Sequence, residues 1–378
     1  LIKEKDLRLE YIYRCDLGRS GYYKDVEPIE NGTKLIWRKS ISNIPVGGCK
    51  TNPIYYKEKI YLGTWDNFFI SIDSKTSDII WKKSINVTSY SPIIISGVIF
   101  LGGIINEESG IYGLDSENGD ILYKFVLTID EAVESLIFKD NLLIFVTFSP
   151  KYGGINNIYI LDIKNNEIKR VRKPNYVRML NNKELNIYNN SLILCFYDSI
   201  YAYDINNNKV LWTKQIKNPA SNIIVSDEKI FVYSDKSLLS INANNGKIIW
   251  ELKIPYCKEM VVDDINIYFC SIDGYLYAIN KNLGKIEWKI EIGEIKENSM
   301  QIVKNIIYLV RFLKIEGHTP ITPETSPQFS LIGVDIYKHE IIWTEKSIVI
   351  IDKLPAVSDF SIYIPNSSFI DKFINSGF

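Results

Sequence analysis

The chain has 378 residues, and its 44 Lys and Arg against 45 Asp and Glu give a formal net charge of -1. This balance argues against general nucleic-acid binding, which needs a basic excess to neutralise phosphates. Apolar residues make up 46% of the chain, which is enough for a large core and excludes a disordered protein.

The first 33 residues contain four tyrosines, at positions 11, 13, 22 and 23, but no hydrophobic leader. Nowhere in the chain does an uncharged apolar run reach the ~18 residues that cross a bilayer, so we expect no membrane span. We favour a cytoplasmic protein, and a periplasmic or secreted one if a leader has been removed. We expect residues 1–33 to be an extension that packs on the main domain, along its outside.

One nine-residue pattern occurs seven times along the chain. It begins with Asp or Asn, continues through a short polar turn, and ends on an aromatic residue in six units and on Arg170 in the third. The units are Asp73–Trp81, Asp115–Tyr123, Asp162–Arg170, Asp204–Trp212, Asn242–Trp250, Asn280–Trp288 and Asp335–Trp343. Between them, short Ile, Val, Tyr and Phe runs alternate with Asn, Asp, Gly and Ser. A period of ~40 to 45 residues made of short strands predicts the blades of a β-propeller.

Small residues stand two positions before the Asp or Asn in six of the seven units, whereas the third unit has Ile160 there. A small side chain leaves a gap in which a bulky ring can insert. We therefore expect the tryptophans to dock onto packed blades as structural residues. They are Trp37, Trp81, Trp212, Trp250, Trp288 and Trp343.

These units resemble the PQQ-like repeat with its tryptophan-docking pattern, roughly A-x-D-x-x-T-G-K-x-x-W. The likeness is strongest in AYDINNNKVLW, SINANNGKIIW and AINKNLGKIEW, and it covers nearly the whole chain. The resemblance implies an eight-bladed propeller. It also implies a choice of function, because the family includes both quinoprotein alcohol dehydrogenases and the outer-membrane assembly factor BamB, which is a scaffold.

Seven units leave an eighth blade to be completed. After Trp343 the chain offers strands near 354–357, 360–365 and 369–374 but no outer aromatic strand, and residues 34–41 supply one. We therefore predict an all-β fold, an eight-bladed β-propeller of four-stranded blades whose last blade is closed by an N-terminal strand. Residues 34–378 would form this single propeller domain. A seven-bladed ring of the kelch or WD40 type is the alternative.

The sequence offers no recognisable catalytic motif. Its two histidines, His318 and His339, lie in no nucleophile or metal motif, and no GxxxxGK phosphate loop occurs. The five cysteines form neither a CxxC nor the adjacent Cys-Cys pair that the resembling dehydrogenases carry over their cofactor. We expect no cofactor, no metal and no enzymatic activity. A quinone-dependent alcohol dehydrogenase is the less favoured alternative.

One face of the ring is predicted to be acidic. If the strands of a blade are named a to d from the axis outward, the b–c and d–a loops share this face. An acidic surface can steer a basic protein partner, although ordinary solvated loop charge also explains it. The candidate residues are Glu107, Glu108, Asp130, Glu131, Glu134, Glu259, Glu294 and Glu297. A long insertion at 313–328, which contains His318, belongs to the same face, and such loops are often functional.

The third unit suggests a second candidate surface. Its last strand reads EIKRVRK, with basic residues where other units have Ile-Ile-Trp. Arg170 and Arg172 would share one side of this strand and could contact an acidic partner. Protection of an exposed strand edge is the plainer explanation.

Taken together, these features predict a monomeric, non-catalytic scaffold that binds another protein and no nucleic acid. Two finer functions stay open. Free cysteines and irregular repeats suit an immunity protein that neutralises a specific toxin. The family resemblance implies an envelope assembly factor like BamB, which would require export.

Overall fold

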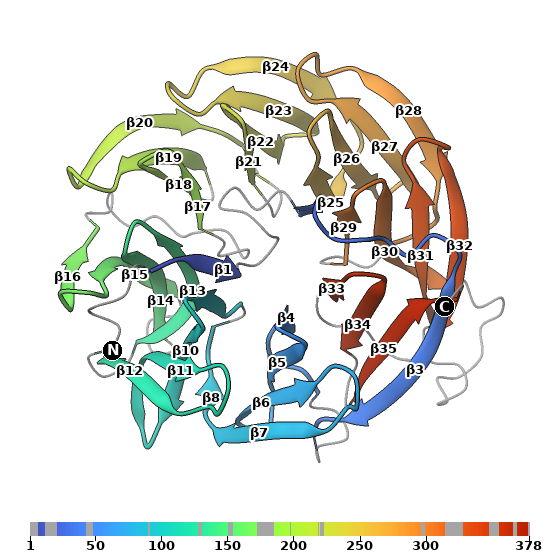
Figure 1. Cartoon of the computed structure of the whole chain (residues 1–378). Coiled ribbons are helices and arrows are strands. Elements are labelled where there is room, and N and C mark those ends of the chain that lie inside the picture. The colour runs from blue at the N-terminus through green and yellow to red at the C-terminus, as the bar shows by residue number, and fades with distance from the viewer. Residues whose placement is uncertain are drawn as a thin grey trace, which may run out of the picture.

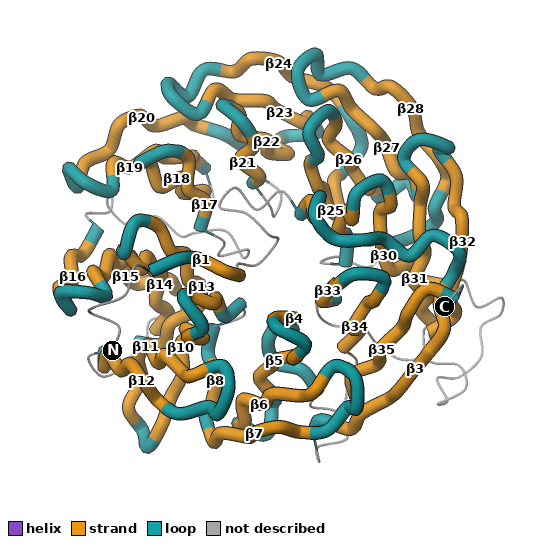
Figure 2. The backbone as a smooth tube through the Cα atoms, in the orientation of Figure 1, coloured by secondary structure: helices purple, strands orange, loops and turns teal. Residues whose placement is uncertain are grey.

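The computed structural model describes residues 7–11, 21–42, 48–89, 91–127, 131–149, 154–171, 185–196, 198–217, 219, 223–295, 299–313, 328–347, 355–365 and 369–376. These residues form strands and turns and no helix, arranged as eight sheets around one axis (Figure 1). Tight a–b and c–d turns join the strands within the blades (Figure 2). The predicted all-β, eight-bladed propeller is confirmed, and the seven-bladed alternative is excluded.

Each blade is an antiparallel meander of strands a, b, c and d from the axis outward. Blade 1 consists of β4 (Ile54–Tyr56), β5 (Lys59–Gly63), β6 (Phe68–Asp73) and β7 (Ile79–Ser84), and blade 2 of β9 (Ile93–Ile95), β10 (Val98–Ile105), β11 (Glu108–Asp115) and β12 (Ile121–Val126). Blade 3 consists of β13 (Ala132–Lys139), β14 (Leu142–Ser149), β15 (Gly154–Asp162) and β16 (Glu167–Arg170), and blade 4 of β17 (Asn186–Tyr188), β18 (Ser191–Cys195), β19 (Ser199–Asp204) and β20 (Lys209–Gln215). A short strand, β8 (Asn86–Val87), also pairs with β10.

The second half of the ring repeats this plan. Blade 5 consists of β21 (Ile224–Ser226), β22 (Lys229–Ser234), β23 (Ser237–Asn242) and β24 (Ile248–Lys253), and blade 6 of β25 (Cys257–Val262), β26 (Asn266–Ser271), β27 (Tyr275–Asn280) and β28 (Ile286–Glu291). Blade 7 consists of β29 (Gln301–Val303), β30 (Ile306–Leu313), β31 (Gln328–Asp335) and β32 (Glu340–Ser347), and blade 8 of β33 (Ala356–Ser358), β34 (Ser361–Pro365), β35 (Phe369–Asn375) and β3 (Thr33–Ser40). Because strand direction alternates, the a–b and c–d turns share one face of the ring and the b–c and d–a loops share the other.

Blade 8 is built from both ends of the chain, as predicted. Strand β3 pairs antiparallel with β35 from Thr33 opposite Asn375 to Ser40 opposite Phe369. Next to this ladder, the Ser376 N–H donates to the Gly32 carbonyl at 2.9 Å. The ring is therefore closed by hydrogen bonds between its first and last blade-forming segments.

The two described strands before β3 lie at the inner edge of the ring, and for them the expectation of packing along the outside is wrong. Strand β1 (Leu9–Tyr11) pairs antiparallel with β9, and β2 (Tyr22–Tyr23) pairs parallel with β29 (Figure 1). Both partners are the innermost strands of their blades. Their inner edges carry backbone N–H and C=O groups that need partners, and the extended N-terminal residues supply them. Strand β1 runs away from the a–b face at blade 2, and β2 runs toward that face at blade 7.

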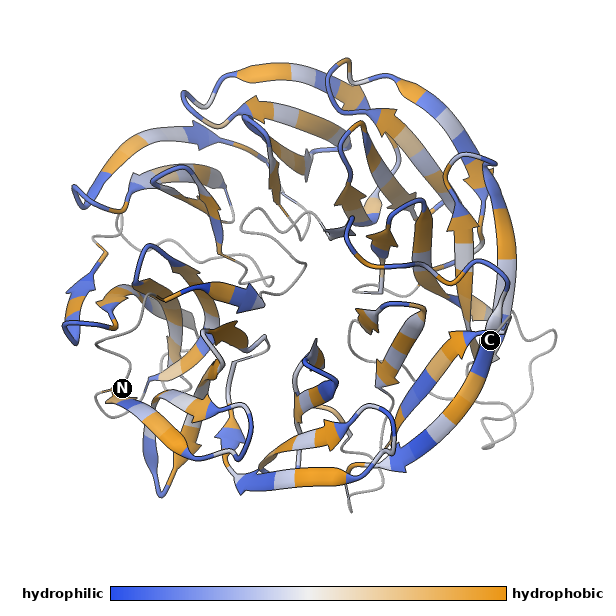
Figure 3. Ribbon diagram, viewed as in Figure 1, coloured by the Kyte–Doolittle hydropathy of each residue, from blue (hydrophilic) through white to orange (hydrophobic). Residues whose placement is uncertain are grey.

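The hydrophobic core lies between the blades rather than at one centre. The inner strands are apolar on both faces; in β22 (KIFVYS), for example, five of six residues are buried. Each face packs on the neighbouring blade, and hydropathy colouring shows the apolar residues gathered on these strands (Figure 3). Burial of both sheet faces drives this arrangement, because neither face of a blade is left to water except at the outer strand.

Candidate functional site

The Asp or Asn that opens each repeat unit organises the c–d turn. Asp204 Oδ1 accepts the backbone N–H groups of Asn206 and Asn207, each at 3.0 Å, and Oδ2 accepts the side-chain amide of Asn207 at 2.8 Å. These donors, with the Asn207 side chain first, hold the pKa of Asp204 below its ordinary value. Asn280 binds its own turn in the same way. The side-chain oxygens are thus turn acceptors, and this use leaves them poorly suited to hold a ligand.

The tryptophans connect each blade to the next. Trp250 Nε1 donates to the Lys281 carbonyl at 3.0 Å, and its ring covers Gly284, where an added Cβ would lie 2.5 Å from the Trp250 ring. Four others make the same kind of bond, Trp37 to Ser74, Trp81 to Ser116, Trp212 to Ala243 and Trp343 to Ile29. The last acceptor belongs to the N-terminal segment, which therefore replaces the missing c–d turn of blade 8.

Sequence analysis missed the role of His339. The residue four places after each Asp or Asn has a positive φ in all seven units, whether it is Ser77, Gly119, Asn166, Asn208, Gly246, Gly284 or His339. His339 is the member of this set in blade 7, and its ring stacks on Trp288 of blade 6 at 4.6 Å between centroids. Alignment of the seven units was the signal that could have identified it as a docking residue.

Two carboxylates of the predicted acidic face lie inside the protein. The side chain of Glu259 is only 1% exposed, and its Oε2 accepts the Ser299 backbone N–H at 2.9 Å. Glu134 is also buried, in β13. Glu131 is held by three side chains of blade 3, because Thr147, Asn157 and Tyr159 all donate to its carboxylate; this set anchors the loop that leads into β13. The exposed surface of this face therefore does not include Glu134 or Glu259.

Three other predicted carboxylates are exposed on the b–c and d–a side. Glu108 forms an ion pair with Lys124, and Glu294 Oε1 lies 2.9 Å from Lys258 Nζ. Glu107 lies in the b–c turn of blade 2 with a positive φ. Lysines pair with two of these three carboxylates, which weakens any steering by them.

The remaining predicted positions divide between described and undescribed segments. Asp130, Glu297, His318 and Arg172 lie outside the described residues, as does the insertion between β30 and β31 apart from its two end residues. Arg170 is exposed at the end of β16 and pairs with Tyr159 across the ladder. The structure therefore does not gather the sequence-predicted residues into one site.

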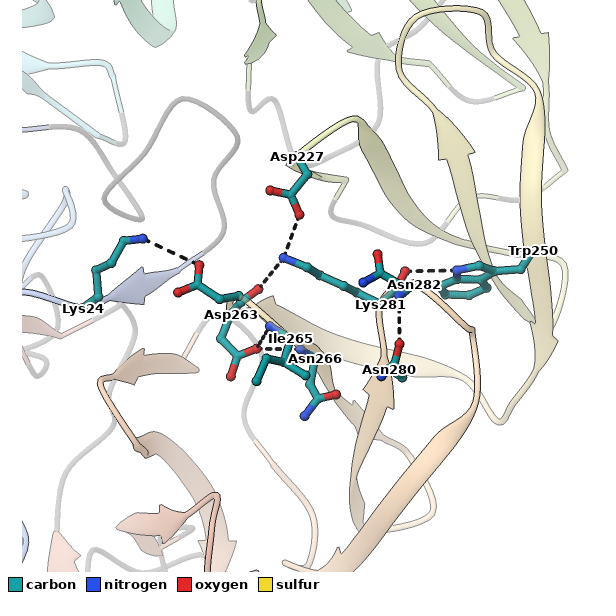
Figure 4. A network of polar contacts seen from close by, with 10 residues as sticks. Lys24, Asp227, Trp250, Asp263, Ile265, Asn266, Asn280, Lys281 and Asn282 are labelled. Carbon is teal, nitrogen blue, oxygen red and sulfur yellow. Dashed lines mark hydrogen bonds and ion pairs between the residues drawn. The ribbon is translucent and has the colours of Figure 1, made fainter.

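The opposite face carries a connected polar network at blades 5 and 6 (Figure 4). Lys281 is buried, and its Nζ donates to the Asp263 carbonyl at 3.0 Å and pairs with Asp227 Oδ2 at 2.8 Å. From the N-terminal segment, Lys24 Nζ lies 3.6 Å from Asp264 Oδ1. Lys24 thus joins the turns of two blades to the N-terminal segment just after β2.

Asp263 fixes the a–b turn of blade 6 within this network. Its Oδ1 accepts the backbone N–H groups of Ile265 at 2.7 Å and Asn266 at 2.6 Å (Figure 4), and its Oδ2 accepts the Tyr268 hydroxyl at 2.9 Å. Burial, followed by the charge of Asp263, raises the pKa of Tyr268 well above its ordinary value. The turn is therefore rigidly placed by a carboxylate whose oxygens are both occupied.

The turns of this face differ in polarity around the ring. The two residues at the tip of each a–b turn, from blade 1 to blade 8, are Lys57–Glu58, Ser96–Gly97, Asp140–Asn141, Asn189–Asn190, Asp227–Glu228, Asp264–Ile265, Lys304–Asn305 and Asp359–Phe360. The second and third residues after the Asp or Asn of each c–d turn, from blade 1 to blade 7, are 75–76, 117–118, 164–165, 206–207, 244–245, Asn282–Leu283 and Tyr337–Lys338. In blades 1 to 5 all of these residues are polar or Gly. Large apolar residues occur at these tips in blades 6, 7 and 8.

Neither a metal centre nor a membrane span is found in the described part of the chain. Within it, no three or more His, Cys, Asp or Glu side chains converge as metal ligands would. None of its residues forms a helix long and apolar enough to cross a membrane. Four cysteines, Cys49, Cys195, Cys257 and Cys270, are buried, and burial raises the pKa of Cys195 to about 12. Such a thiol stays protonated and unreactive.

A protein-family comparison matches most of the chain. The family model described as outer membrane protein assembly factor BamB matches residues 24–251 and again residues 189–368. This match confirms the PQQ-like repeat resemblance. No curated protein matches the chain in sequence.

Solved propellers share the fold at low sequence identity. A quinohemoprotein alcohol dehydrogenase from Comamonas testosteroni has a TM-score of 0.72 at 11% identity, over 97% of this chain and 80% of that chain. The computationally designed Ika8 protein has a TM-score of 0.63 at 12% identity, over 89% and 98%. BamB from Moraxella catarrhalis has a TM-score of 0.50 at 10% identity, over 92% and 98%. At such identities the likeness shows the shared fold alone.

Proposed function

Because this chain belongs to the PQQ-like propeller family of the outer membrane protein assembly factor BamB, we propose that it is a non-catalytic scaffold that binds another protein. A fold of this kind hosts both enzymes and scaffolds, so the proposal rests on the distribution of side chains. The repeat's Asp and Asn side chains bind their own turns, as at Asp204 and Asn280. What the ring offers a partner is its two faces.

The observation that carries the proposal is the position of strands β1 and β2 at the inner edge of the ring. Small-molecule sites are concave and enclosed, and in a ring of blades the enclosed place is the axis. Here β1 and β2 add to the innermost strands of blades 2 and 7, so the chain's own backbone lies where a cofactor would enter. The described residues at the axis therefore fit a quinone poorly, which supports a scaffold over a dehydrogenase.

We propose protein binding, and both envelope assembly and toxin neutralisation are compatible with it. A stable interface takes about 800 Å² from each partner, which is a small part of the 17002 Å² surface of this chain. Assembly of envelope proteins and neutralisation of a toxin would both use such an interface. We propose that the scaffold is a monomer, because the pairing of β3 with β35 completes the last blade within one chain.

The test is direct binding between purified proteins. The full chain would be tagged and cross-linked in its source cell, and the protein that it captures would then be purified and titrated against it by calorimetry. Designed Ika8 serves as a ring-shaped control bait. Saturable binding to this chain and not to Ika8 supports the scaffold.

The enzyme alternative is tested in parallel. Purified chain would be incubated with pyrroloquinoline quinone, Ca²⁺ and a series of primary alcohols, and dye reduction would be followed. We expect no alcohol-dependent reduction above a buffer control. Turnover in this assay, or no saturable protein partner in the first experiment, would overturn the proposed function.

A further inference from the structure

We propose that the turns of blades 6, 7 and 8 on the a–b and c–d face dock a segment of the partner protein that combines apolar side chains with Lys or Arg. This inference rests on the proposed protein-binding function and names the surface and the chemistry. The surface, called the turn patch below, is centred on Ile265, Leu283, Tyr337 and Phe360.

The position of these residues in the repeat argues against a structural role. The same turn tips in blades 1 to 5 carry only polar residues or Gly. The c–d turns of Leu283 and Tyr337 have the same hydrogen bond as the c–d turns of blades 1, 2, 4 and 5, whereas the a–b turn of Ile265 differs from those of blades 1 to 5 in having no positive φ at its tip. The geometry of the c–d turn therefore requires no apolar side chain there. Four apolar side chains at the tips of three consecutive blades are a departure from the repeat, which folding does not explain at Leu283 and Tyr337.

Exposure strengthens this argument. Tyr337 is 76% exposed, Leu283 64% and Ile265 59%, and these are the three most exposed large apolar side chains in the described part of the chain. Single exposed apolar residues are ordinary on protein surfaces, whereas a group on adjacent turns marks an interaction site. Phe360, at the edge of the patch, is less exposed.

The backbone beneath the patch is held in place before any partner binds. The Lys281 N–H donates to the Ile265 carbonyl at 3.1 Å, which ties the a–b turn of blade 6 to the c–d turn that bears Leu283. The Lys281 side chain then bridges Asp263 and Asp227, as Figure 4 shows. A preorganised platform loses little entropy on binding.

The N-terminal segment joins the three blades of the patch. Its β2 pairs with β29 of blade 7. Further along, the Glu27 N–H donates to Asp359 Oδ1 at 2.9 Å, and the Phe360 N–H donates to the Glu27 carbonyl at 2.9 Å, which anchors the a–b turn of blade 8. The segment that lines the channel thus continues as part of the proposed docking surface.

Charge at the patch selects the partner's chemistry. The carboxylates here are Asp25, Glu27, Asp263, Asp264 and Asp359, and the lysines are Lys24, Lys285, Lys304 and Lys338, five against four. Lys24 pairs with Asp264 and Lys304 with Glu27, which leaves a small negative excess. The Lys281–Asp227 pair adds no net charge. Burial first, then Asp264 and Asp263, raise the pKa of Tyr22, in keeping with negative surroundings. Complementarity therefore favours cationic side chains beside the apolar ones.

The experiment compares two variants of the full chain. The turn-patch variant carries Ile265→Asn, Leu283→Asn and Tyr337→Asn, which installs the residue type found at these tips in other blades. The control variant carries Trp65→Asn and Ile272→Asn, which removes apolar side chains that are 52% and 57% exposed on the opposite face. Because all five positions are exposed turn residues, both variants should keep the thermal midpoint of the parent.

The probe is an array of ten-residue peptides in three compositions, Lys with Leu, Glu with Leu, and Lys with Ser. We expect the parent and the control variant to bind the Lys–Leu peptides, and the turn-patch variant to bind them roughly tenfold more weakly. The Glu–Leu and Lys–Ser peptides should bind the parent weakly. Equal binding by the parent and the turn-patch variant, or a preference for Glu–Leu, overturns the inference.

The partner protein from the preceding section separates the two proposals. If it binds the parent and the turn-patch variant with the same Kd, the docking surface is wrong and the scaffold function stands. If it binds the control variant normally and the turn-patch variant roughly tenfold more weakly, both are supported. If no protein binds saturably, the scaffold function fails and this inference fails with it.

Discussion

Blades 5 and 3 each have four strands and a nine-residue repeat unit, Asn242–Trp250 and Asp162–Arg170, yet their outer strands pair differently. In blade 5 the ladder between β23 and β24 shifts register after Ser240, so that Trp250 lies opposite Ser240 and Ile248 opposite Ile241. The extra residue is Ile249, which makes a β-bulge. In blade 3 the ladder between β15 and β16 runs without a shift.

The bulge decides which residue takes the docking position. With it, the aromatic residue of blade 5 falls opposite a small side chain and reaches the turn of blade 6. Without it, Lys169 lies opposite Ile160 in blade 3, and Arg170 lies opposite Tyr159. All four residues of β16 are exposed. The outer strand of blade 3 therefore adds little to the joint with blade 4, which depends on the inner strands.

The three features of the docking unit occur together in six blades. Blade 8 has the register shift and Trp37, but Lys372 lies opposite this ring. Blades 1, 2, 4, 5, 6 and 7 combine the register shift, the small residue and the aromatic ring. Blade 3 lacks all three but keeps the turn, where the Tyr123 hydroxyl of blade 2 donates to Asn166 Oδ1 at 2.9 Å. The unit is thus a joint to the following blade, and it is separable from the blade's own fold.

The largest difference in unfolding free energy between blades 5 and 3 should appear when the last residue of each repeat unit, Trp250 or Arg170, is replaced by Ala. Trp250→Ala removes a ring that packs on Phe231 and Gly284 and a hydrogen bond to blade 6. It should cost about 3 to 5 kcal/mol in the free energy of unfolding. Arg170→Ala should change it by under about 0.5 kcal/mol. Denaturant titration of both variants measures this, and a Trp250→Ala cost under about 1 kcal/mol would contradict the docking role.

A smaller effect should separate two glycines with the same backbone requirement. Gly284 has φ +66° and lies under the Trp250 ring, whereas Gly293 has φ +79° and nothing within 4 Å of an added Cβ. Alanine at either position carries the cost of a positive φ, about 1 kcal/mol. Gly284→Ala should cost about 1 to 3 kcal/mol more, because the ring must move. Thermal and denaturant unfolding compare the pair, and equal costs would show that the ring does not rest on the turn.

Much of the fold follows from the sequence because the docking unit has a fixed spacing. The distance from Asp or Asn to the aromatic residue places strands c and d. After Trp343 no further unit ends on an aromatic residue, so the outer strand of the last blade must come from residues 34–41. The path of the N-terminal segment could not be predicted in this way. Strands β1 and β2 have three and two residues, belong to no repeat, and pair with partners far along the chain.

The candidate site was predicted less well, for a geometric reason. In strands a of blades 3 and 6 the register shifts beside Glu134 and Glu259, and a slip of one residue exchanges the buried and exposed sides of a strand. Carboxylates assigned to loops from sequence therefore lie in the interior. Leu283 and Tyr337, in contrast, were visible as apolar residues at polar turn positions, and alignment of the units by their Asp or Asn would have identified them.

The smallest expected effect concerns acid, and it compares blade 4 with blade 5. Blade 4 opens its turn with Asp204, whose pKa is held below the ordinary value by the Asn207 side chain and by backbone N–H groups. Blade 5 uses Asn242, whose Oδ1 accepts the Asn244 N–H at 2.9 Å and does not titrate. A carboxylate with a lowered folded pKa stabilises the fold above its ordinary pKa, and this contribution is lost as the pH falls through the folded value.

The exchange of these two residues gives matched variants. Asp204→Asn should lose less thermal stability than the parent between pH 6 and pH 3, because the amide still accepts the turn N–H groups and carries no proton equilibrium. Asn242→Asp should lose more, because it adds a carboxylate that must be protonated in acid. Thermal midpoints of the three proteins at both pH values, at one ionic strength, measure the difference. If all three lose the same stability, the turn carboxylates are not linked to folding, and acid sensitivity must come from another part of the ring.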